Sequence, residues 1–273
     1  MCVNSGTKYG NQLSRWEGLL LAMTCVFTMN DEIMAKPFVD LSIVILTYNE
    51  QNNLSALIPA IQRVMDDERI AYEILVIDGH STDGTPEEAR SLGAIVRLQQ
   101  YPGYGSALRE GFAAASGEYI LTLDGDNSHD PAYISNLWNK RKMADLVIAS
   151  RFCRGGGSAA SFLRLSLSQI LNRVYALILG LPLKDISSGY RLYRSSCVRS
   201  VCFRGMGFDV LESIAATLYL SGYKVVEVPF LYCRRLNGYS KAAVFSVGTR
   251  LVITLGYLLL KKARLQRHKR AGY

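Results

Sequence analysis

The segment Leu41-Ser-Ile-Val-Ile-Leu-Thr-Tyr-Asn-Glu50 opens with a nearly continuous apolar run and ends in polar residues. A run of this length predicts a strand that is buried on both faces of a parallel sheet. Apolar residues then return at helical spacing from Leu54 to Met65, with Asn52 as a candidate N-cap. The segment therefore predicts the first strand and the first helix of an α/β fold.

The same alternation of apolar runs and helical periodicity continues along the chain and weakens beyond Ser150. It predicts an α/β fold with a mostly parallel central sheet and helices on both faces. Further strands are predicted over residues 73–77, 94–99, 119–123, 146–149 and 225–232, with a short strand within 185–194. Further helices are predicted from Thr85 onward and over residues 104–115, 131–143, 162–179 and 208–221.

Polar residues follow several of these strands at the point where each strand ends. Residues 47–50 follow the first strand, Asp78 and Gly79 follow the second, and residues 124–126 follow the fourth. Ligands of such sheets lie beyond the carboxyl ends of the strands. These polar groups are therefore expected to converge on one edge of the sheet.

Two carboxylates, Asp124 and Asp126, stand one residue apart at the end of a predicted buried strand. Such a pair can share a hard divalent cation, because Mg²⁺ and Mn²⁺ take oxygen ligands and keep positions open for substrate phosphates. A D-x-D pattern alone is often only a turn, but its position after an apolar strand favours a metal site. Asp78 is a candidate for binding a base or ribose edge, while Asp83 and Gly84 are expected to serve turn geometry.

A glycine-containing segment, Tyr101-Pro-Gly-Tyr-Gly105, precedes a predicted helix. Glycines at a helix N-terminus allow backbone amides to approach a phosphate, which makes Gly105 a candidate contact. The segment is not a P-loop, because it lacks G-K-[ST]. It also lacks the G-x-G-x-x-G spacing, which argues against a dinucleotide-binding dehydrogenase.

The charge of the chain points to an anionic partner. The 273 residues carry a net charge of +8, and six basic residues gather between Lys261 and Arg270. Nucleic acid is a poor candidate, because these basic residues lack interleaved aromatic side chains. The six cysteines show no CxxC pair and no metal-ligand spacing, so they are expected to be reduced thiols of a cytosolic protein.

Two apolar stretches raise the question of a membrane. The stretch from Leu19 to Met29 is too short to span a bilayer. Residues 244–260 form a longer stretch, but Arg250 interrupts it and makes spanning costly. A helix that lies in the interface before a basic tail fits this pattern, and the alternative is a helix packed on the core. The expected division is an N-terminal extension (1–38), a main domain (39–243) and an amphipathic helix with a basic tail (244–273).

Several motifs together resemble family 2 glycosyltransferases, above all the dolichyl-phosphate mannosyltransferase group and its bacterial polyprenyl-phosphate relatives. They appear in the order of that family and span roughly residues 41–241. They are Leu46-Thr-Tyr-Asn-Glu50, Asp78-Gly-His-Ser-Thr-Asp-Gly84, Gly103-Tyr-Gly105, Leu123-Asp-Gly-Asp126 with Ser128-His-Asp-Pro131, Ser150-Arg151, Asp185-Ile-Ser-Ser-Gly-Tyr-Arg191 and Arg235-Leu-Asn-Gly-Tyr-Ser-Lys241.

The resemblance implies a GT-A fold and assigns roles to residues of this chain. Asp124 and Asp126 are implied as ligands of Mg²⁺ or Mn²⁺, with Ser128 as a third polar group. The implied contacts to the nucleotide-sugar donor are Thr47, Tyr48, Glu50, Asp78 and Gly105. The implied contacts to the diphosphate and the acceptor phosphate are Arg151, Arg164, Ser168, Arg235 and Lys241, and the catalytic residues are Asp126, Arg151 and Arg235.

The expected reaction is inverting, metal-dependent transfer of a sugar from a nucleoside-diphosphate sugar to a polyprenyl phosphate. The protein is expected at the cytoplasmic face of a membrane as a peripheral protein, alone or with a membrane partner subunit. An ionised phosphate needs no strong general base. One alternative is transfer to a sugar or lipid hydroxyl, for which Asp185 is the candidate base. Another is a non-catalytic, membrane-associated nucleotide-sugar-binding protein.

Overall fold

The computed structural model describes residues 38–233 and 244–270. The chain divides into two compact units, Met1–Phe38 and Val39–Tyr273, and the fold described below belongs to the second. Apart from Phe38, the predicted N-terminal extension lies outside the described residues. The division into 1–38, 39–243 and 244–273 stays a prediction.

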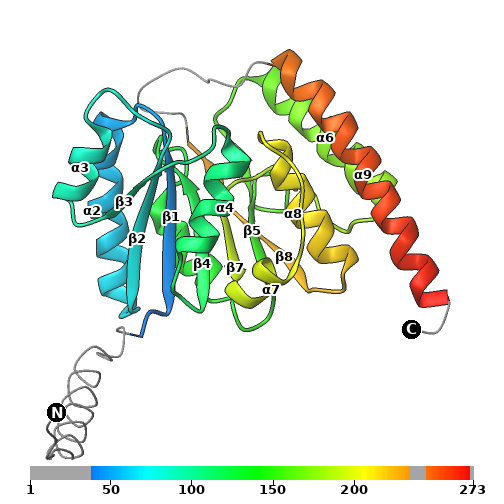
Figure 1. Ribbon diagram of the computed structural model, residues 1–273, viewed down its shortest axis with the longest axis horizontal. Coiled ribbons are helices and arrows are strands. Elements are labelled where there is room, and N and C mark those ends of the chain that lie inside the picture. The colour runs from blue at the N-terminus through cyan, green and yellow to red at the C-terminus, as the bar shows by residue number, and fades with distance from the viewer. Residues whose placement is uncertain (1–37, 234–243, 271–273) are drawn as a thin grey trace, which may run out of the picture. The chain divides into compact units, whose positions relative to one another are not determined.

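A seven-stranded sheet forms the centre of the described unit, in the order β3-β2-β1-β4-β7-β5-β8 (Figure 1). Neighbouring strands run parallel except at β7, which is antiparallel to both β4 and β5. The predicted α/β fold with a mostly parallel sheet is thus confirmed. The strands are β1 (Leu41–Thr47), β2 (Tyr72–Asp78), β3 (Ile95–Leu98), β4 (Tyr119–Asp124), β5 (Leu146–Ser150), β7 (Arg191–Arg194) and β8 (Val225–Pro229).

Helices cover both faces of the sheet, because successive residues of a strand point to opposite sides. Ile43 packs in one core cluster with Leu57 of α2, whereas Val44 packs in the other with Leu108 of α4 and Ile214 of α8. The helices are α2 (Gln51–Glu68), α3 (Thr85–Ser91), α4 (Tyr104–Ala114), α5 (Ile134–Trp138), α6 (Phe162–Leu179), α7 (Ser195–Ser200), α8 (Asp209–Leu220) and α9 (Val244–Arg270), with a 3₁₀ turn over Pro131–Tyr133.

The predicted helix over residues 131–143 is shorter in the structure and ends at Trp138. Beyond it, the amides of Lys140 and Arg141 donate to carbonyls three residues back, which is the spacing of tight turns. The guanidinium of Arg141 also lies 4.0 Å from the centre of the Trp138 ring. The predicted end at Met143 was therefore wrong.

The predicted strand over residues 225–232 is interrupted at Phe230. Strand β8 ends at Pro229, which has no amide hydrogen to donate to a sheet. The Phe230 amide then donates to Ser150, and its carbonyl accepts the amide of Gly157. The chain thereby leaves the large sheet, and β9 (Leu231–Tyr232) pairs with β6 (Gly157–Ser158) in a second, two-stranded sheet.

Helices α6 and α9 lie side by side near the β8 end of the sheet (Figure 1). The Tyr175 hydroxyl of α6 donates to the Leu251 carbonyl of α9. The Thr254 hydroxyl donates to Asp209 at the start of α8, at 2.8 Å. In this structure the C-terminal helix thus packs along one side on the folded domain.

The carboxyl ends of β1, β2 and β4 meet at one edge of the sheet. The register places Asp78 opposite Thr47 and Asp124 opposite Leu46. The amide of Gly79 donates to the Thr47 carbonyl at 2.9 Å, so the three strands end level with one another. The polar residues that follow them are therefore brought together, as the strand pattern predicted.

Candidate active site

The loops that follow β1 and β2 are joined by side-chain hydrogen bonds. The Asn49 amide donates to the Ser81 hydroxyl at 2.8 Å, and the Thr82 amide donates to Asn49 Oδ1 at 2.9 Å. Asn49 has a φ of 55°, a left-handed conformation that asparagine tolerates better than most residues. This pairing fixes the loop that carries Tyr48, whose side chain is half exposed.

Asp78 is fully buried and its carboxylate accepts three hydrogen bonds. The Thr47 hydroxyl donates at 3.0 Å, and Ser81 donates both its amide, at 2.8 Å, and its hydroxyl. Thr47 and Asp78 therefore organise the loop in this structure. Direct contact between Asp78 and a nucleotide stays a prediction, and it would require Ser81 to release the carboxylate.

Glu50 lies next to the loop that contains the two acids. A Cβ atom added at Gly125 would lie 3.6 Å from Cβ of Glu50 and only 2.9 Å from Cγ2 of Thr47. The Glu50 carboxylate accepts a 2.6 Å hydrogen bond from the Asn53 amide group, and the Asn127 amide group donates to the Asn53 carbonyl at 2.9 Å. The residue between the two acids must therefore be small, and Glu50 borders them.

Asp124 and Asp126 occupy different surroundings within this loop. Asp124 is partly exposed and accepts a 3.1 Å hydrogen bond from the Tyr104 hydroxyl. Burial, followed by the nearby charge of Asp124, raises the pKa of Tyr104 well above its usual value, which keeps the hydroxyl protonated as a donor. Asp126 is buried, and its Oδ1 accepts the amide of Ser128 at 3.0 Å and the Ser128 hydroxyl. Both carboxylates are thus held in defined orientations.

The donor set at this loop fits a hard divalent cation. Asp124, Asp126, Ser128 and Tyr104 offer only oxygen atoms, which Mg²⁺ and Mn²⁺ prefer. Among the described residues no group of three or more His, Cys, Asp or Glu side chains is arranged to hold a metal ion. An ion bound here would therefore need water or substrate phosphate as additional ligands, which is the usual case for Mg²⁺. The metal-ligand role of Asp124, Asp126 and Ser128 stays a prediction.

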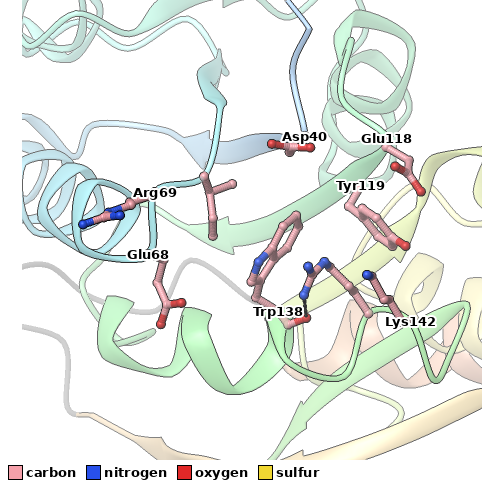
Figure 2. Close-up of a pocket in the computed structure, with 9 residues that line it drawn as sticks. Asp40, Glu68, Arg69, Glu118, Tyr119, Trp138 and Lys142 are labelled. Carbon is pink, nitrogen blue, oxygen red and sulfur yellow. Dashed lines mark hydrogen bonds between the residues drawn. The ribbon is translucent and has the colours of Figure 1, made fainter.

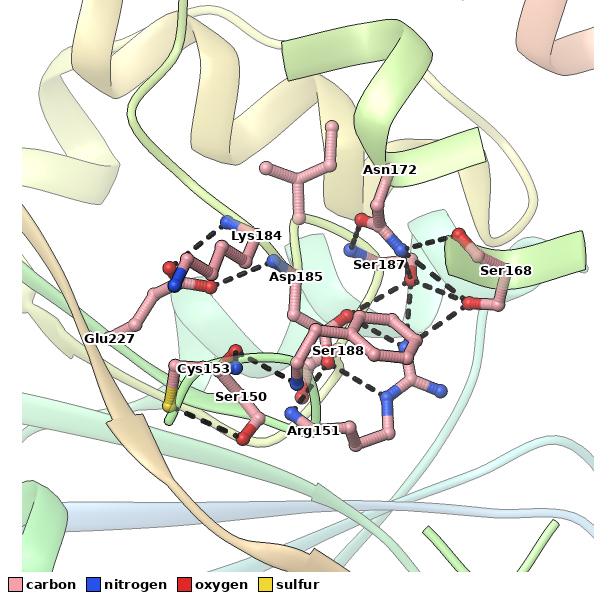
Figure 3. A network of polar contacts seen from close by, with 12 residues as sticks. Ser150, Arg151, Cys153, Ser168, Asn172, Lys184, Asp185, Ser187, Ser188 and Glu227 are labelled. Atoms are coloured by element: carbon pink, nitrogen blue, oxygen red, sulfur yellow. Dashed lines mark hydrogen bonds and ion pairs between the residues drawn. The ribbon is translucent and has the colours of Figure 1, made fainter. Parts of the chain in front are cut away.

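On the far side of β4 from β1, Arg151 is held by Asp185 (Figure 3). The guanidinium donates Nε to Oδ2 at 2.8 Å and Nη2 to Oδ1 at 2.7 Å, and the Arg151 amide donates to Oδ2 at 2.9 Å. The Asp185 side chain is fully buried and that of Arg151 is 16% exposed. Burial alone would lower the pKa of Arg151, but the hydrogen bonds and the charge of Asp185 raise it. The guanidinium therefore stays protonated.

Helix α6 is connected to this ion pair through its polar side. The Asn172 amide group donates to Ser187 Oγ at 2.8 Å, and Ser187 Oγ accepts Nη2 of Arg151 at 2.9 Å (Figure 3). Ser168 Oγ lies 3.4 Å from the same Nη2. Ser168 is thus brought to Arg151 as the site prediction requires, whereas Arg164 lies one turn earlier on α6 and is exposed.

Arg191, which the sequence placed in the motif after Asp185, is fully buried in the structure. It donates to the carbonyls of Ile186 and Ser188, each at 2.6 Å, and to the carbonyl of Leu211 in α8 at 2.9 Å. These bonds fix the loop that holds Asp185. Arg191 is therefore a structural residue.

The glycine segment before α4 packs against another part of the chain. The Gly105 amide donates to the Met206 carbonyl at 3.0 Å, and a Cβ atom added at Gly105 would lie 2.3 Å from the Gly205 carbonyl oxygen. Gly103 has a φ of 105°, and a Cβ atom added there would lie 2.5 Å from the Met206 carbonyl oxygen. The glycines therefore allow two backbones to approach. A phosphate contact at Gly105 stays a prediction that would need the bond to Met206 to open.

Two predicted site residues, Arg235 and Lys241, lie outside the described residues. Cys233, the last described residue before them, donates its amide to the Ser128 carbonyl at 3.1 Å and so lies beside the loop of Asp124 and Asp126.

Sequence reasoning assigned no role to several residues that shape the site. Tyr104 contacts Asp124, and Nδ1 of His129 accepts the Asp124 amide at 3.1 Å. Asn172 supports Ser187, and the Glu227 carboxylate accepts the amide of Asp185 at 2.7 Å. Tyr104 and His129 belong to motifs quoted above, so the sequence did contain a signal for these two residues. The sequence contains no such signal for Asn172 and Glu227, because their partners are distant in sequence.

A separate hollow of about 370 Å³ lies at the opposite ends of the strands (Figure 2). Asp40 directly precedes β1 and Tyr119 begins β4, so both mark the amino ends. Its lining also mixes charges of both signs, including Arg69 and Glu118. The loop of Asp124 and Asp126, at the carboxyl ends of the strands, offers the chemistry for a charged ligand. We therefore regard that edge of the sheet as the candidate site.

Comparison with known proteins points to one family. Residues 42–202 match the family described as Glycosyl transferase family 2. The chain is 34% identical over 210 residues to a dolichol-phosphate mannosyltransferase of Pyrococcus furiosus, which covers 73% of this chain and 58% of the relative. It is 33% identical over 194 residues to glycosyltransferase AglJ of Haloferax volcanii, covering 70% of this chain and 62% of that one. The matched part is thus less than two thirds of each relative's length.

Solved structures share the fold. Glucosyl-3-phosphoglycerate synthase from Mycobacterium tuberculosis, crystallised with Mn²⁺, UDP-glucose and phosphoglyceric acid, has a TM-score of 0.65 at 20% identity, covering 81% of this chain and 80% of that one. The same enzyme with Mg²⁺ and UDP has a TM-score of 0.64 at 21% identity, covering 82% and 79%. The chain therefore has the GT-A fold that its motifs implied.

Proposed function

The chain belongs to glycosyl transferase family 2, and we propose that it transfers a sugar from a nucleoside-diphosphate sugar to a polyprenyl phosphate, with inversion and with a divalent metal ion. A relative that is 34% identical is named as a dolichol-phosphate mannosyltransferase, which supports this class of acceptor. In the proposed reaction an acceptor phosphate oxygen forms a bond to the anomeric carbon while the bond to the nucleoside diphosphate breaks. The diphosphate leaves with the electron pair of that bond.

The observation that carries the proposal is the pairing of Arg151 with Asp185. Nε and Nη2 of Arg151 are used on Asp185, whereas Nη1 makes no hydrogen bond to any residue in the described part of the chain. An oriented guanidinium whose Nη1 is still available can donate to an oxygen of an acceptor phosphate. Ser168 and, one turn away, Arg164 lie on the same side of α6 and would complete the acceptor phosphate site.

The same pairing disfavours transfer to a hydroxyl acceptor. A hydroxyl needs a base to remove its proton, and Asp185 was the candidate for that role. Its carboxylate is fully buried and accepts bonds from Arg151 and Ser187, so no substrate reaches it in this structure. A phosphate monoester has a second pKa near 6 and is already ionised at neutral pH. It requires no such base.

On the donor side, Asp124 and Asp126 are the residues that would hold the metal ion, with Ser128 and Tyr104 orienting them. A bound Mg²⁺ or Mn²⁺ would supply positive charge that stabilises the leaving diphosphate. Tyr48 and Glu50 lie in the loop after β1, which is hydrogen-bonded to the loop after β2. Both residues border this edge of the sheet and would contact the nucleotide. Arg235 and Lys241 would add positive charge from the segment beyond Cys233.

The proposed place of action is the cytoplasmic face of a membrane, because a polyprenyl chain resides in the bilayer. We propose peripheral attachment, either alone or with a membrane partner subunit.

A donor screen tests this function. The full chain is incubated with GDP-mannose, UDP-glucose or UDP-N-acetylglucosamine, Mn²⁺ and a short polyprenyl phosphate, and products are read by mass spectrometry. We expect one donor to give a glycosylated polyprenyl phosphate that disappears when the metal is chelated. Nucleotide-sugar binding without turnover for every donor would support the non-catalytic alternative instead.

A further inference from the structure

Helix α6 carries an apolar stripe on its outer side. Leu163, Leu167, Ile170, Val174 and Leu177 follow one another at spacings of four, three, four and three residues, which places them on one face of a helix. Their exposed fractions are 79%, 55%, 58%, 42% and 85%. A continuous row of exposed apolar side chains is uncommon on a soluble surface and marks an interaction site.

The opposite side of α6 is bound to the folded domain. Asn172, Tyr175 and Leu179 are buried there at helical spacing, and Ser168 lies on the same side. Asn172 is bonded to Ser187, and Tyr175 is bonded to Leu251 of α9. The helix therefore has an outer apolar side and an inner side attached to the site.

Among the described residues, α6 alone is long and apolar enough to cross a membrane. Crossing would expose Asn172 and Ser168 to hydrocarbon and break their bonds to Ser187 and Arg151, which is costly for polar groups. Arg164 and Arg173 also lie on the exposed surface of the helix. An orientation in the plane of the membrane surface satisfies both sides at once.

The neighbouring helix extends the same kind of surface and adds charge. Val252, Ile253 and Leu260 of α9 are 71%, 72% and 64% exposed. Arg264 and Arg267 are exposed one to two turns further on. Lys262 lies within 3.4 Å of the Ile178 carbonyl at the end of α6, which connects the two helices.

We propose that α6 and the described part of α9 form one docking surface that lies flat on a bilayer containing anionic lipid. The surface consists of the apolar stripe Leu163–Leu177 on α6, of Val252, Ile253 and Leu260 on α9, and of the basic residues Lys262, Arg264 and Arg267 beside them. Apolar side chains enter the interface while arginine and lysine meet the head groups. A second copy of the chain is a poorer occupant, because a twofold contact would bring like cations together.

This inference rests on the proposed function only for its purpose, namely to bring Arg151 to a lipid-borne acceptor. The inner side of α6 contacts Arg151 through Ser168, and the outer side would contact the bilayer. The acceptor phosphate would thus reach the site at the depth of the lipid head groups without the acyl chain leaving the membrane.

Vesicle flotation of the full chain tests the docking surface. The vesicles contain phosphatidylcholine alone, or phosphatidylcholine and phosphatidylglycerol in equal parts. The test variant is Leu167→Glu/Leu177→Glu. The matched control is Ile95→Glu/Leu98→Glu on the edge strand β3, where the two side chains are 49% and 52% exposed. Figure 1 shows β3 and α6 at opposite sides of the sheet.

We expect the wild-type chain and the control to bind the anionic vesicles, more weakly at high salt and more weakly still to the neutral ones. The test variant should bind at least about 10-fold more weakly, since burying one leucine side chain contributes about a factor of ten or more. Equal binding of test variant and control would overturn the proposal. So would a wild-type dimer, seen by light scattering, that the test variant converts to monomer without any vesicle binding.

Transfer to a short, water-soluble prenyl phosphate separates this proposal from the proposed function. If the test variant retains that transfer but no longer binds vesicles, the docking surface and the proposed function are both supported. Vesicle binding without any transfer by the wild-type chain would contradict the function alone. Transfer by a wild-type chain that binds no vesicles would contradict the docking surface alone. Circular dichroism confirms that each variant is folded.

Discussion

Arg151 and Asp185, which are 34 residues apart in sequence, face each other through two parallel hydrogen bonds of 2.8 and 2.7 Å. A bidentate pair of this kind fixes the plane of the guanidinium. Both side chains are largely removed from water, which makes the pair sensitive to the loss of either member. Asp185 thus orients a cation in this structure and is not placed to act as a base.

Replacing Asp185 by Asn should destabilise the protein and weaken acceptor binding. Removing one partner of a buried ion pair leaves the other charge uncompensated, which costs about 3–5 kcal/mol. We expect a lower midpoint of urea unfolding and a raised KM for the acceptor. Because Asp185 is not a base in this account, the pH profile of kcat should keep its shape. Loss of the acidic limb of that profile, where a catalytic base would become protonated, would favour the hydroxyl-acceptor alternative.

Replacing Asp124 or Asp126 by Asn should lower kcat by at least ~10²-fold, since loss of a preorganised charge partner costs about 3 kcal/mol or more. Binding of Mn²⁺ in the presence of nucleoside diphosphate, followed by electron paramagnetic resonance, should weaken in parallel. Asp67→Asn, at an exposed position on α2, is the matched control and should leave both unchanged. Near wild-type turnover in either acid variant would refute the metal assignment.

Replacing Asn172 by Ala tests whether α6 positions Arg151 through Ser187. The variant loses the 2.8 Å bond to Ser187 and the 3.2 Å bond from the Ser187 amide. An unsatisfied buried group costs about 1–3 kcal/mol. We expect acceptor KM to rise by roughly 5- to 150-fold from that cost, with donor KM unchanged. Equal effects on both substrates would indicate general unfolding, and Arg173→Ala at an exposed site of α6 is the control.

Glu212 should make stability depend on pH in an unusual direction. Burial raises the pKa of Glu212 from 4.5 to about 8, partly offset by its own backbone hydrogen bond and by Arg191, while Asp209 and Asp185 raise it further. Between these two pKa values the folded protein holds a proton that the unfolded chain has released, so the free energy of unfolding falls as pH rises. The full contribution is present only below about pH 4.5.

Glu212→Gln removes this titration, so its urea midpoint should fall less between those pH limits than that of the wild-type chain. At the high end the variant should be the more stable of the two. If the urea midpoints of the two proteins changed with pH in parallel across the whole range, that result would contradict the raised pKa of Glu212.

The elements that could be predicted are those whose signal is local. Continuous apolar runs identified β1, β2 and β4, and the bounds predicted for α6 match the structure. Gly180 ends that helix in a left-handed conformation with a φ of 70°, which glycine adopts without strain. The acid pair could also be predicted, because Asp124 is the last residue of β4 and Asp126 lies two residues beyond it.

The features that sequence could not supply are contacts between distant segments. The antiparallel direction of β7 depends on its pairing with β4 and β5 rather than on its own residues. The partner of Arg151 is likewise remote, and Asp185 by itself suggested a base. The bond between Thr47 and Asp78 also joins residues 31 positions apart, which no local pattern indicates.

Competition between two acceptors shows whether the enzyme transfers the sugar to a phosphate or to a hydroxyl. With the active donor and Mn²⁺, the full chain is given equal amounts of a short polyprenyl phosphate and the corresponding polyprenol, and both products are quantified by mass spectrometry. We expect only the phosphate to be glycosylated, and we expect Arg151→Lys, which loses the bidentate geometry, to reduce this product. Glycosylated polyprenol, formed at a comparable rate, would contradict transfer to a phosphate.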